Sequence, residues 1–72
     1  MEIQTLLAQN IKAAIDRQGL KQKYVAERAG FTDNSFSAML TGRKLLRAEY
    51  IPIIADALGV TPNDLYSADR PA

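Results

Sequence analysis

Residues 22–42 read QKYVAERAGFTDNSFSAMLTG, and this stretch decides the fold. Its apolar residues recur at helical spacing in two short runs, one over residues 22–29 and the other over residues 33–40. Only Gly30, Phe31 and Thr32 lie between the runs. Glycine favours the left-handed backbone that ends a helix, and a threonine side chain can cap the start of the next one. The stretch therefore predicts two short helices joined by a tight turn.

The two predicted helices must cross steeply, because so few residues join them. A small residue is needed where they touch, which Ala26 supplies, and a residue with positive φ is needed at the turn, which Gly30 supplies. Apolar residues stand at the other positions that such a crossing has to bury: Val25, Ala29, Phe31, Phe36 and Met39. This combination predicts a helix-turn-helix, and a generic helical hairpin in a small bundle is the alternative.

Helices are also expected on both sides of this motif. The first runs from about residue 3 to residue 18, and its apolar face consists of Ile3, Leu7, Ile11, Ala14 and Ile15. The fourth begins near residue 48, because Pro52 is tolerated only in a first turn, and its buried side consists of Tyr50, Ile51, Ile54, Ala55 and Leu58. A short fifth helix over residues 62–66 is expected to start with a capping box between Thr61 and Asp64.

No segment shows the two-residue alternation of a strand, so the expected fold class is all-α. A length of 72 residues allows one compact domain with a single core. We expect this five-helix domain to occupy residues 1–66 and to be followed by a flexible C-terminal tail over residues 67–72.

The composition excludes several function classes. The chain has no Cys and no His, which rules out disulfides, thiol or imidazole catalysis and Cys/His zinc sites. Ser35 and Ser37 have no identifiable base to activate them, so neither an enzyme nor a cofactor is expected. Because the sequence has no apolar run near the ~18 residues of a membrane span and no signal peptide, we expect a cytoplasmic protein without a membrane partner.

The charge is small overall but unevenly distributed. The formal net charge is +1, yet residues 12–47 carry eight cations against three anions, a balance of +5, whereas residues 48–72 carry −3. A basic middle is typical of a protein that binds a polyanion. Taken alone, however, the charge distribution is better explained by an unevenly charged, solvated surface than by a polyanion-binding site.

Two segments carry a family resemblance: Leu20-Lys21-Gln22 through Gly42, and ADALGVT over residues 55–61. They resemble the phage repressor and Cro family of lambda-repressor-like DNA-binding domains. The resemblance implies a sequence-specific, double-stranded DNA-binding transcriptional regulator, with repressor as the expected kind. It implies further that the third helix enters the major groove, as part of a homodimer on a palindromic operator.

The resemblance also implies which side chains read bases. They lie on the solvent face of the third helix: Asp33, Asn34, Ser37 and Ala38. A carboxamide such as that of Asn34 can bond adenine N6 and N7 together, Asp33 could accept from cytosine N4, and Ala38 could touch a thymine methyl. Many family members carry Gln, Arg or Lys at three of these positions. Asp33 is therefore equally well interpreted as a partner of the helix dipole that repels phosphate, with DNA shape supplying part of the specificity.

A second group of residues is expected to contact phosphates. Gln22 matches the family's glutamine at the start of the second helix, which bonds a phosphate and braces the recognition helix. Arg43, Lys44 and Arg47 directly follow the recognition helix and would lie along the DNA backbone, where contacts are blind to sequence. The remaining candidates are Lys21, Lys23, Thr32, Ser35 and Thr41.

Four apolar residues are candidates for a dimer interface. Leu45 and Leu46 stand side by side in a basic loop, and we expect one of them to be buried and the other to lie at an interface. Leu65 and Tyr66 of the fifth helix are the other candidates. The alternative function is a protein–protein interaction module that uses the same fold without binding DNA, and no small-molecule ligand is indicated in either case.

Overall fold

The computed structural model describes residues 2–67. Five α-helices follow one another over this range: α1 (Ile3–Arg17), α2 (Gln22–Ala29), α3 (Asp33–Leu40), α4 (Ile51–Leu58) and α5 (Pro62–Tyr66). A single 3₁₀ turn, η1 (Ala48–Tyr50), leads into α4, and no strand occurs in the described part of the chain. The prediction of an all-α, five-helix fold is confirmed.

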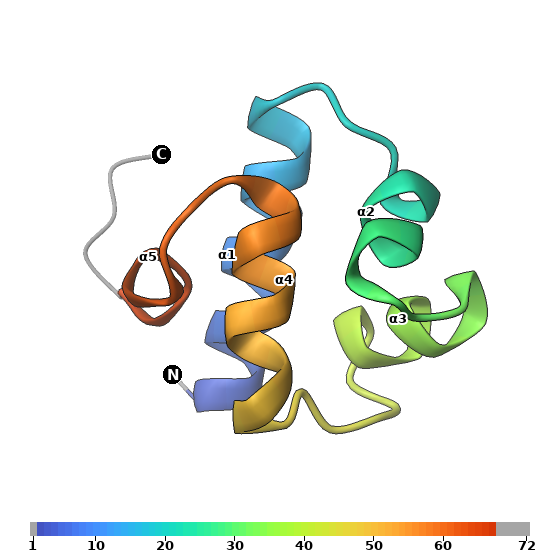
Figure 1. The fold of residues 1–72 in the computed structure, drawn as a ribbon. Coiled ribbons are helices and arrows are strands. Elements are labelled where there is room, and N and C mark those ends of the chain that lie inside the picture. The colour runs from blue at the N-terminus through green and yellow to red at the C-terminus, as the bar shows by residue number, and fades with distance from the viewer. Residues whose placement is uncertain (1, 68–72) are drawn as a thin grey trace.

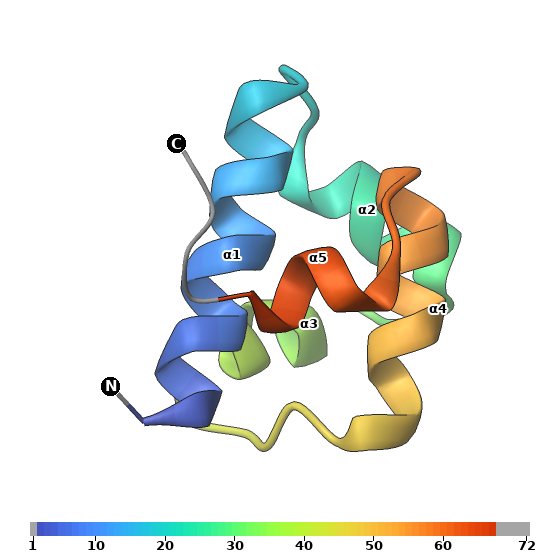
Figure 2. The same ribbon diagram turned by 90° about the vertical axis from the view of Figure 1, so that its left-hand side faces the viewer.

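The helices form a small bundle in which α1 and α4 lie between α5 on one side and α2 with α3 on the other (Figure 1). Helix α5 packs against α1 and α4, whereas α2 packs against α3 and α4. Helix α1 also contacts α3 (Figure 2). One continuous core fills the space between them, and its largest fully buried side chains are Phe36, Ile11, Ile51, Ile54, Leu65 and Val25.

The predicted helix limits hold with small corrections. Helix α1 ends at Arg17, with Gln18 as its cap, and its apolar face begins at Leu7, because Ile3 at the first turn stays 47% exposed. The fourth helix starts as the 3₁₀ turn η1, and its α-helical part begins only at Ile51. Pro52 thereby falls in the first turn of α4, where a missing N–H costs nothing.

Three carboxamides, two in α1 and one in its C-terminal cap, bond the later elements to the bundle. Gln4 accepts a hydrogen bond from the Leu46 backbone N–H at 2.7 Å and donates one to the Leu46 carbonyl at 3.1 Å. Gln18 donates to the Leu58 carbonyl at 2.7 Å, at the end of α4. Asn10 donates to the carbonyls of Leu65 and Ser67, at 2.8 and 3.0 Å. Sequence analysis did not identify these bonds.

Ser67, the first residue of the predicted tail, is therefore hydrogen-bonded to the bundle through its carbonyl. Residues 68–72 lie outside the described part of the chain, so the rest of the tail prediction stays a prediction. Among the described helices, none is long and apolar enough to span a bilayer.

Candidate nucleic-acid interface

The turn between α2 and α3 has the geometry predicted for it. Gly30 adopts a φ of +85°, which a residue with a Cβ rarely takes, and this lets the Phe31 N–H bond the Ala26 carbonyl at 2.9 Å. Ala26 is fully buried in the core beside the turn. The Thr32 hydroxyl then accepts a hydrogen bond from the Ser35 N–H at 3.1 Å and so caps α3. The helix-turn-helix prediction is confirmed in its local geometry.

An aromatic cluster fixes the angle at which the turn leaves the bundle. The Phe31 ring stacks on the Phe36 ring with centroids 6.1 Å apart, and it meets the Tyr50 ring edge-on at 5.0 Å. Phe36 lies in the core, whereas Phe31 and Tyr50 are only partly buried. The cluster therefore ties the start of α3 to the turn before α4.

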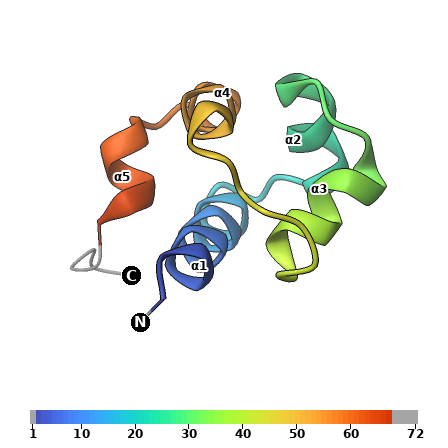
Figure 3. The same ribbon diagram turned by 90° about the horizontal axis from the view of Figure 1, so that it is seen from below.

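Helix α3 has one buried face and one face that no helix covers. Phe36, Met39 and Leu40 point into the core. Asn34, Ala38 and Thr41 follow one another at steps of four and three residues, so they form the middle of the opposite face. Seen from below, α3 lies at the edge of the molecule (Figure 3). The four residues predicted to read bases lie there, with Asp33 and Asn34 exposed and Ser37 and Ala38 half-exposed.

Exposed cations stand at the start of α2 and in the loop that directly follows α3. Lys21 and Lys23 are exposed at the start of α2. Arg43, Lys44 and Arg47 are exposed in the loop that leaves α3. Among these cations, only Arg47 forms an ion pair within the described residues, with its Nε 3.5 Å from a carboxylate oxygen of Glu49. Both side chains of this pair are more than half exposed. Such a solvated pair is weak, so the positive potential of the loop is largely retained.

The loop after α3 folds back along that helix. Gly42 has a φ of +84°, and the N–H groups of Arg43 and Lys44 both donate to the Ala38 carbonyl, at 2.9 and 3.1 Å. The Lys44 ammonium donates to the Ser35 hydroxyl at 2.8 Å. The predicted phosphate residues Ser35 and Lys44 are thus bonded to each other.

Two of the other predicted phosphate residues, Thr41 and Gln22, differ in their contacts with α3. The Thr41 hydroxyl donates to the Ser37 carbonyl at 2.9 Å, where it caps the end of α3. Gln22 is half-buried and lines a shallow hollow of about 340 Å³ with Lys12 and Asp16, but its carboxamide makes no hydrogen bond to α3. The brace expected between Gln22 and the recognition helix is therefore not formed in this structure.

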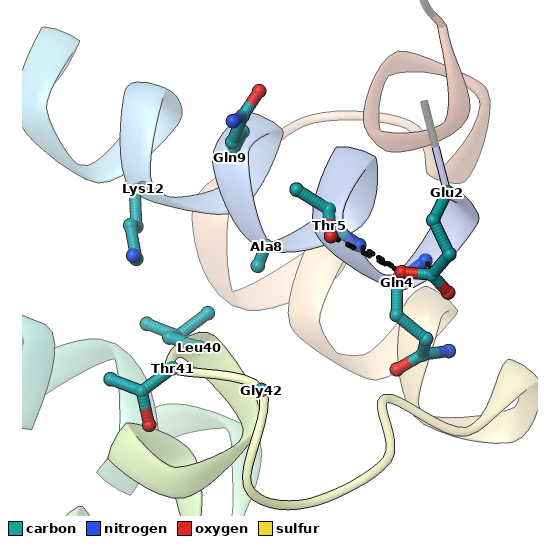
Figure 4. Close-up of a pocket in the computed structure, with 9 residues that line it drawn as sticks. All are labelled: Glu2, Gln4, Thr5, Ala8, Gln9, Lys12, Leu40, Thr41 and Gly42. Carbon is teal, nitrogen blue, oxygen red and sulfur yellow. Dashed lines mark hydrogen bonds between the residues drawn. The ribbon is translucent and has the colours of Figure 1, made fainter.

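A larger hollow of about 510 Å³ lies between the first half of α1 and the end of α3 (Figure 4). Lys12 extends into it toward the end of α3, near Thr41. Lys12 also lines the smaller hollow beside Gln22, so it lies between the start of α2 and the end of α3. Sequence analysis counted this cation but did not assign it to the site, because its position depends on how α1 packs against α3. Over residues 2–67, no group of acidic side chains could hold a metal ion.

The structure corrects two of the four predicted interface residues. Leu46 is 2% exposed and Leu65 is 1% exposed, and both belong to the core, so neither is available to a second chain. The Gln4 carboxamide bonds both the backbone N–H and the carbonyl of Leu46, which holds that leucine against the bundle. Leu45 and Tyr66 are 63% and 40% exposed and remain candidates. As expected, one leucine of the adjacent pair is buried and the other is not.

Comparison with known proteins agrees with this geometry. A family model described as a helix-turn-helix domain matches residues 6–67. A transcription factor from Neisseria, NHTF, described as hypothetical, has a crystal structure similar to this chain with a TM-score of 0.85 at 26% identity, covering 92% of this chain and 76% of its own. The clp gene regulator ClgR from C. glutamicum has the same fold with a TM-score of 0.83 at 20% identity, covering 90% of this chain and 84% of its own.

No curated protein matches the chain in sequence. The family model nevertheless extends over most of the 72 residues, from the first turn of α1 to just past the end of α5, and includes both motif helices and the turn between them. The chain therefore belongs to the helix-turn-helix domain family.

Proposed function

We propose that this chain is a cytoplasmic, sequence-specific transcriptional regulator of the repressor type, which binds double-stranded DNA by inserting α3 into the major groove. The single observation that carries the proposal is the outward face of α3, which no helix covers and which is bordered by the exposed cations Arg43 and Lys44, whose N–H groups bond the Ala38 carbonyl. Membership of the helix-turn-helix domain family supports it. The similarity to NHTF, which is described as a transcription factor, supports the regulatory role.

The proposed base-reading residues are Asp33, Asn34, Ser37 and Ala38. Asn34 is the principal one, because it is exposed in the first turn of α3 and its carboxamide can pair with both N6 and N7 of adenine. The proposed phosphate contacts come from nine residues of the motif and its loop, with Lys12 as an addition: Lys21, Gln22, Lys23, Thr32, Ser35, Thr41, Arg43, Lys44 and Arg47. These contacts position the protein on the duplex without reading its sequence.

We also propose a homodimer on a palindromic operator, with half-site centres about one helical turn apart. Leu45 and Tyr66, two of the exposed large apolar residues, are the proposed contacts of its interface. Selection of bound sequences from a random pool of duplex DNA tests both parts of the proposal. A palindrome supports the dimer, whereas a pool that never becomes enriched contradicts DNA reading and favours a protein-interaction module.

Asn34→Ala separates base reading from general affinity. The variant should lose about 1–3 kcal/mol on the selected site and much less on random DNA. Asn63→Ala is the matched control, because Asn63 is equally exposed but belongs to α5, on the other side of the bundle. Equal losses on both DNA substrates would remove Asn34 from the base-reading set.

Arg43→Ala tests the phosphate contacts. Each lost contact should lower the affinity for every sequence and reduce the salt slope of log K by about 0.9. Arg28→Ala is the control, since Arg28 lies over the Tyr24 ring on the side of α2 that faces away from the core. If both variants changed the salt slope equally, the phosphate contact would not be specific to the cations of the loop.

A further inference from the structure

The loop after α3 brings a lysine back onto the recognition helix. Because Gly42 turns the chain with a φ of +84°, the N–H groups of Arg43 and Lys44 meet the Ala38 carbonyl, and residue 44 starts in the direction of the N-terminus of α3. Its ammonium reaches the hydroxyl of Ser35, nine residues earlier, at 2.8 Å. The side chain therefore runs along α3 and does not continue away from it.

The ammonium ends beside the base-reading face. Ser35 is the third residue of α3, next to Asn34 and one turn before Ala38, so it borders the uncovered face near its N-terminal end. This is the end of the helix that enters the groove most deeply in a helix-turn-helix complex. This position differs from the one expected for a contact with the flanking DNA backbone, which would lie away from the base-reading face.

The Ser35–Lys44 pair presents hydrogen-bond donors to its surroundings. The ammonium has three N–H donors, of which the bond to Ser35 uses one, and the serine hydroxyl keeps its own proton free to donate. The one ion pair in the described residues joins Arg47 and Glu49, so no carboxylate there neutralises Lys44. Of the four bases, guanine alone offers two adjacent acceptors, N7 and O6, in the major groove.

We propose that Lys44, held in position by Ser35, reads a guanine in the major groove of the operator. The proposal rests on the DNA-binding function proposed above; it moves Lys44 from the phosphate set to the base-reading set and removes Ser35 from the phosphate set. It also accounts for the short side chains at positions 37 and 38, because the loop supplies the long donor that α3 itself lacks. Ser35 is then a positioning residue for Lys44.

The experiment is sequence selection from a random duplex pool with the full chain and three variants: Lys44→Met, Ser35→Ala and Arg43→Ala. The wild type should select a guanine at one position of each half-site. Lys44→Met keeps the aliphatic length but removes the charge, so this position alone should become degenerate, with an affinity loss of roughly 5- to 150-fold on the selected site. Arg43→Ala should keep the guanine while its affinity falls on all sequences.

Ser35→Ala tests the positioning role, because it leaves the lysine charge in place. The guanine preference should weaken at the same position while the salt slope stays unchanged, and adding Ser35→Ala to Lys44→Met should cost little more. Both positions are at the surface, and circular dichroism checks that each variant is folded.

A Lys44→Met variant that selects the same bases as the wild type, with a uniform loss of affinity, would overturn the proposal and return Lys44 to the phosphate set. The DNA-binding function would still stand in that case. A wild type that enriches no sequence at all would overturn both proposals together.

Discussion

Thr32 links the turn to α3 through a single hydroxyl. Its oxygen accepts the Ser35 N–H at 3.1 Å, which satisfies one of the backbone donors that the first turn of α3 leaves free. The side chain is otherwise exposed, so the hydrogen bond is its main contribution to stability. A proposed phosphate contact at the same residue would use the same hydroxyl.

Thr32→Ala should therefore destabilise the protein by about 1 kcal/mol, the usual cost of losing an N-cap. Urea unfolding followed by circular dichroism measures this change. Thr32→Ser is the control, because it keeps the capping oxygen and should stay close to the wild type. Equal stability of the alanine and serine variants would show that the cap contributes nothing.

Glu2 caps α1 in a way that depends on pH. Its carboxylate accepts the N–H of Gln4 at 3.0 Å and that of Thr5 at 3.1 Å. The hydrogen bond from the Gln4 backbone lowers the pKa of Glu2 below its ordinary value of 4.5. A carboxyl whose pKa is lower in the folded state stabilises the fold above its unfolded pKa, and this contribution is lost as the pH falls through the folded value.

The stability difference between wild type and Glu2→Gln should thus be present at pH 6 and should vanish below the folded pKa of Glu2. Thermal unfolding of both proteins between pH 6 and pH 2 measures it, and the comparison cancels the other acidic groups. A difference that stays constant with pH would mean that the charge of Glu2 has no part in the cap.

At the scale of elements, α1 holds the rest of the bundle by hydrogen bonds as well as by packing. The bonds from Gln4 to Leu46 join residues 42 positions apart, and they fix the last part of the basic loop to the start of α1. Leu46 can then bury its side chain while Leu45 stays outside. The position of the cations in this loop therefore depends on a residue of another helix.

Gln4→Ala should cost about 1–3 kcal/mol, because the Leu46 N–H and carbonyl lose their partners in a partly buried place. Chemical denaturation measures the loss. The same variant should also weaken DNA binding, since the loop cations lose their fixed position. Gln9→Ala is the matched control: Gln9 lines the same hollow of α1 but is exposed and forms no hydrogen bond. Identical behaviour of the two variants would refute the anchoring role.

The elements that sequence analysis predicted correctly are those that local chemistry determines. Gly30 with Thr32, and Thr61 with Asp64, mark helix ends through bonds between residues at most five positions apart, and the structure contains those bonds. Pro52 restricts the start of α4 in the same local way. Motifs of this kind can be located without knowing the tertiary structure.

Which residues are buried was harder to predict in loops, where the sequence has no helical periodicity. Leu45 and Leu46 have the same side chain in the same loop, and the one that is buried is the one whose backbone bonds Gln4 of another helix. Lys12 joins the candidate site only because α1 packs against α3. The bond from Lys44 to Ser35 likewise needs the turn at Gly42, whose direction the sequence pattern does not specify.

At the scale of the whole molecule, stability depends on a single small core. A domain of 72 residues has an unfolding free energy of roughly 4–11 kcal/mol at typical values per residue. Phe36 is fully buried, stacks on Phe31 and lies on the side of α3 opposite the proposed DNA face. The side chain that anchors α3 is therefore also one of the largest in the core.

Phe36→Ala should cost about 3–5 kcal/mol, a large part of the total stability, and should lower the melting temperature steeply. Differential scanning calorimetry measures the change, and Phe36→Leu, which fills more of the space, should lose less. DNA binding should fall in proportion to the folded fraction. A folded Phe36→Ala variant with normal melting would contradict the assignment of Phe36 to the centre of the core.

The clamp between α1 and the basic loop touches only main-chain atoms of residue 46. Such a clamp accepts any sequence at positions 43–45, because it does not recognise their side chains. If the loop contacts DNA as proposed, we expect that loops with other side chains at these three positions can be grafted between Gly42 and Leu46 to change the DNA sequence that is bound, while the bundle that supports them stays the same.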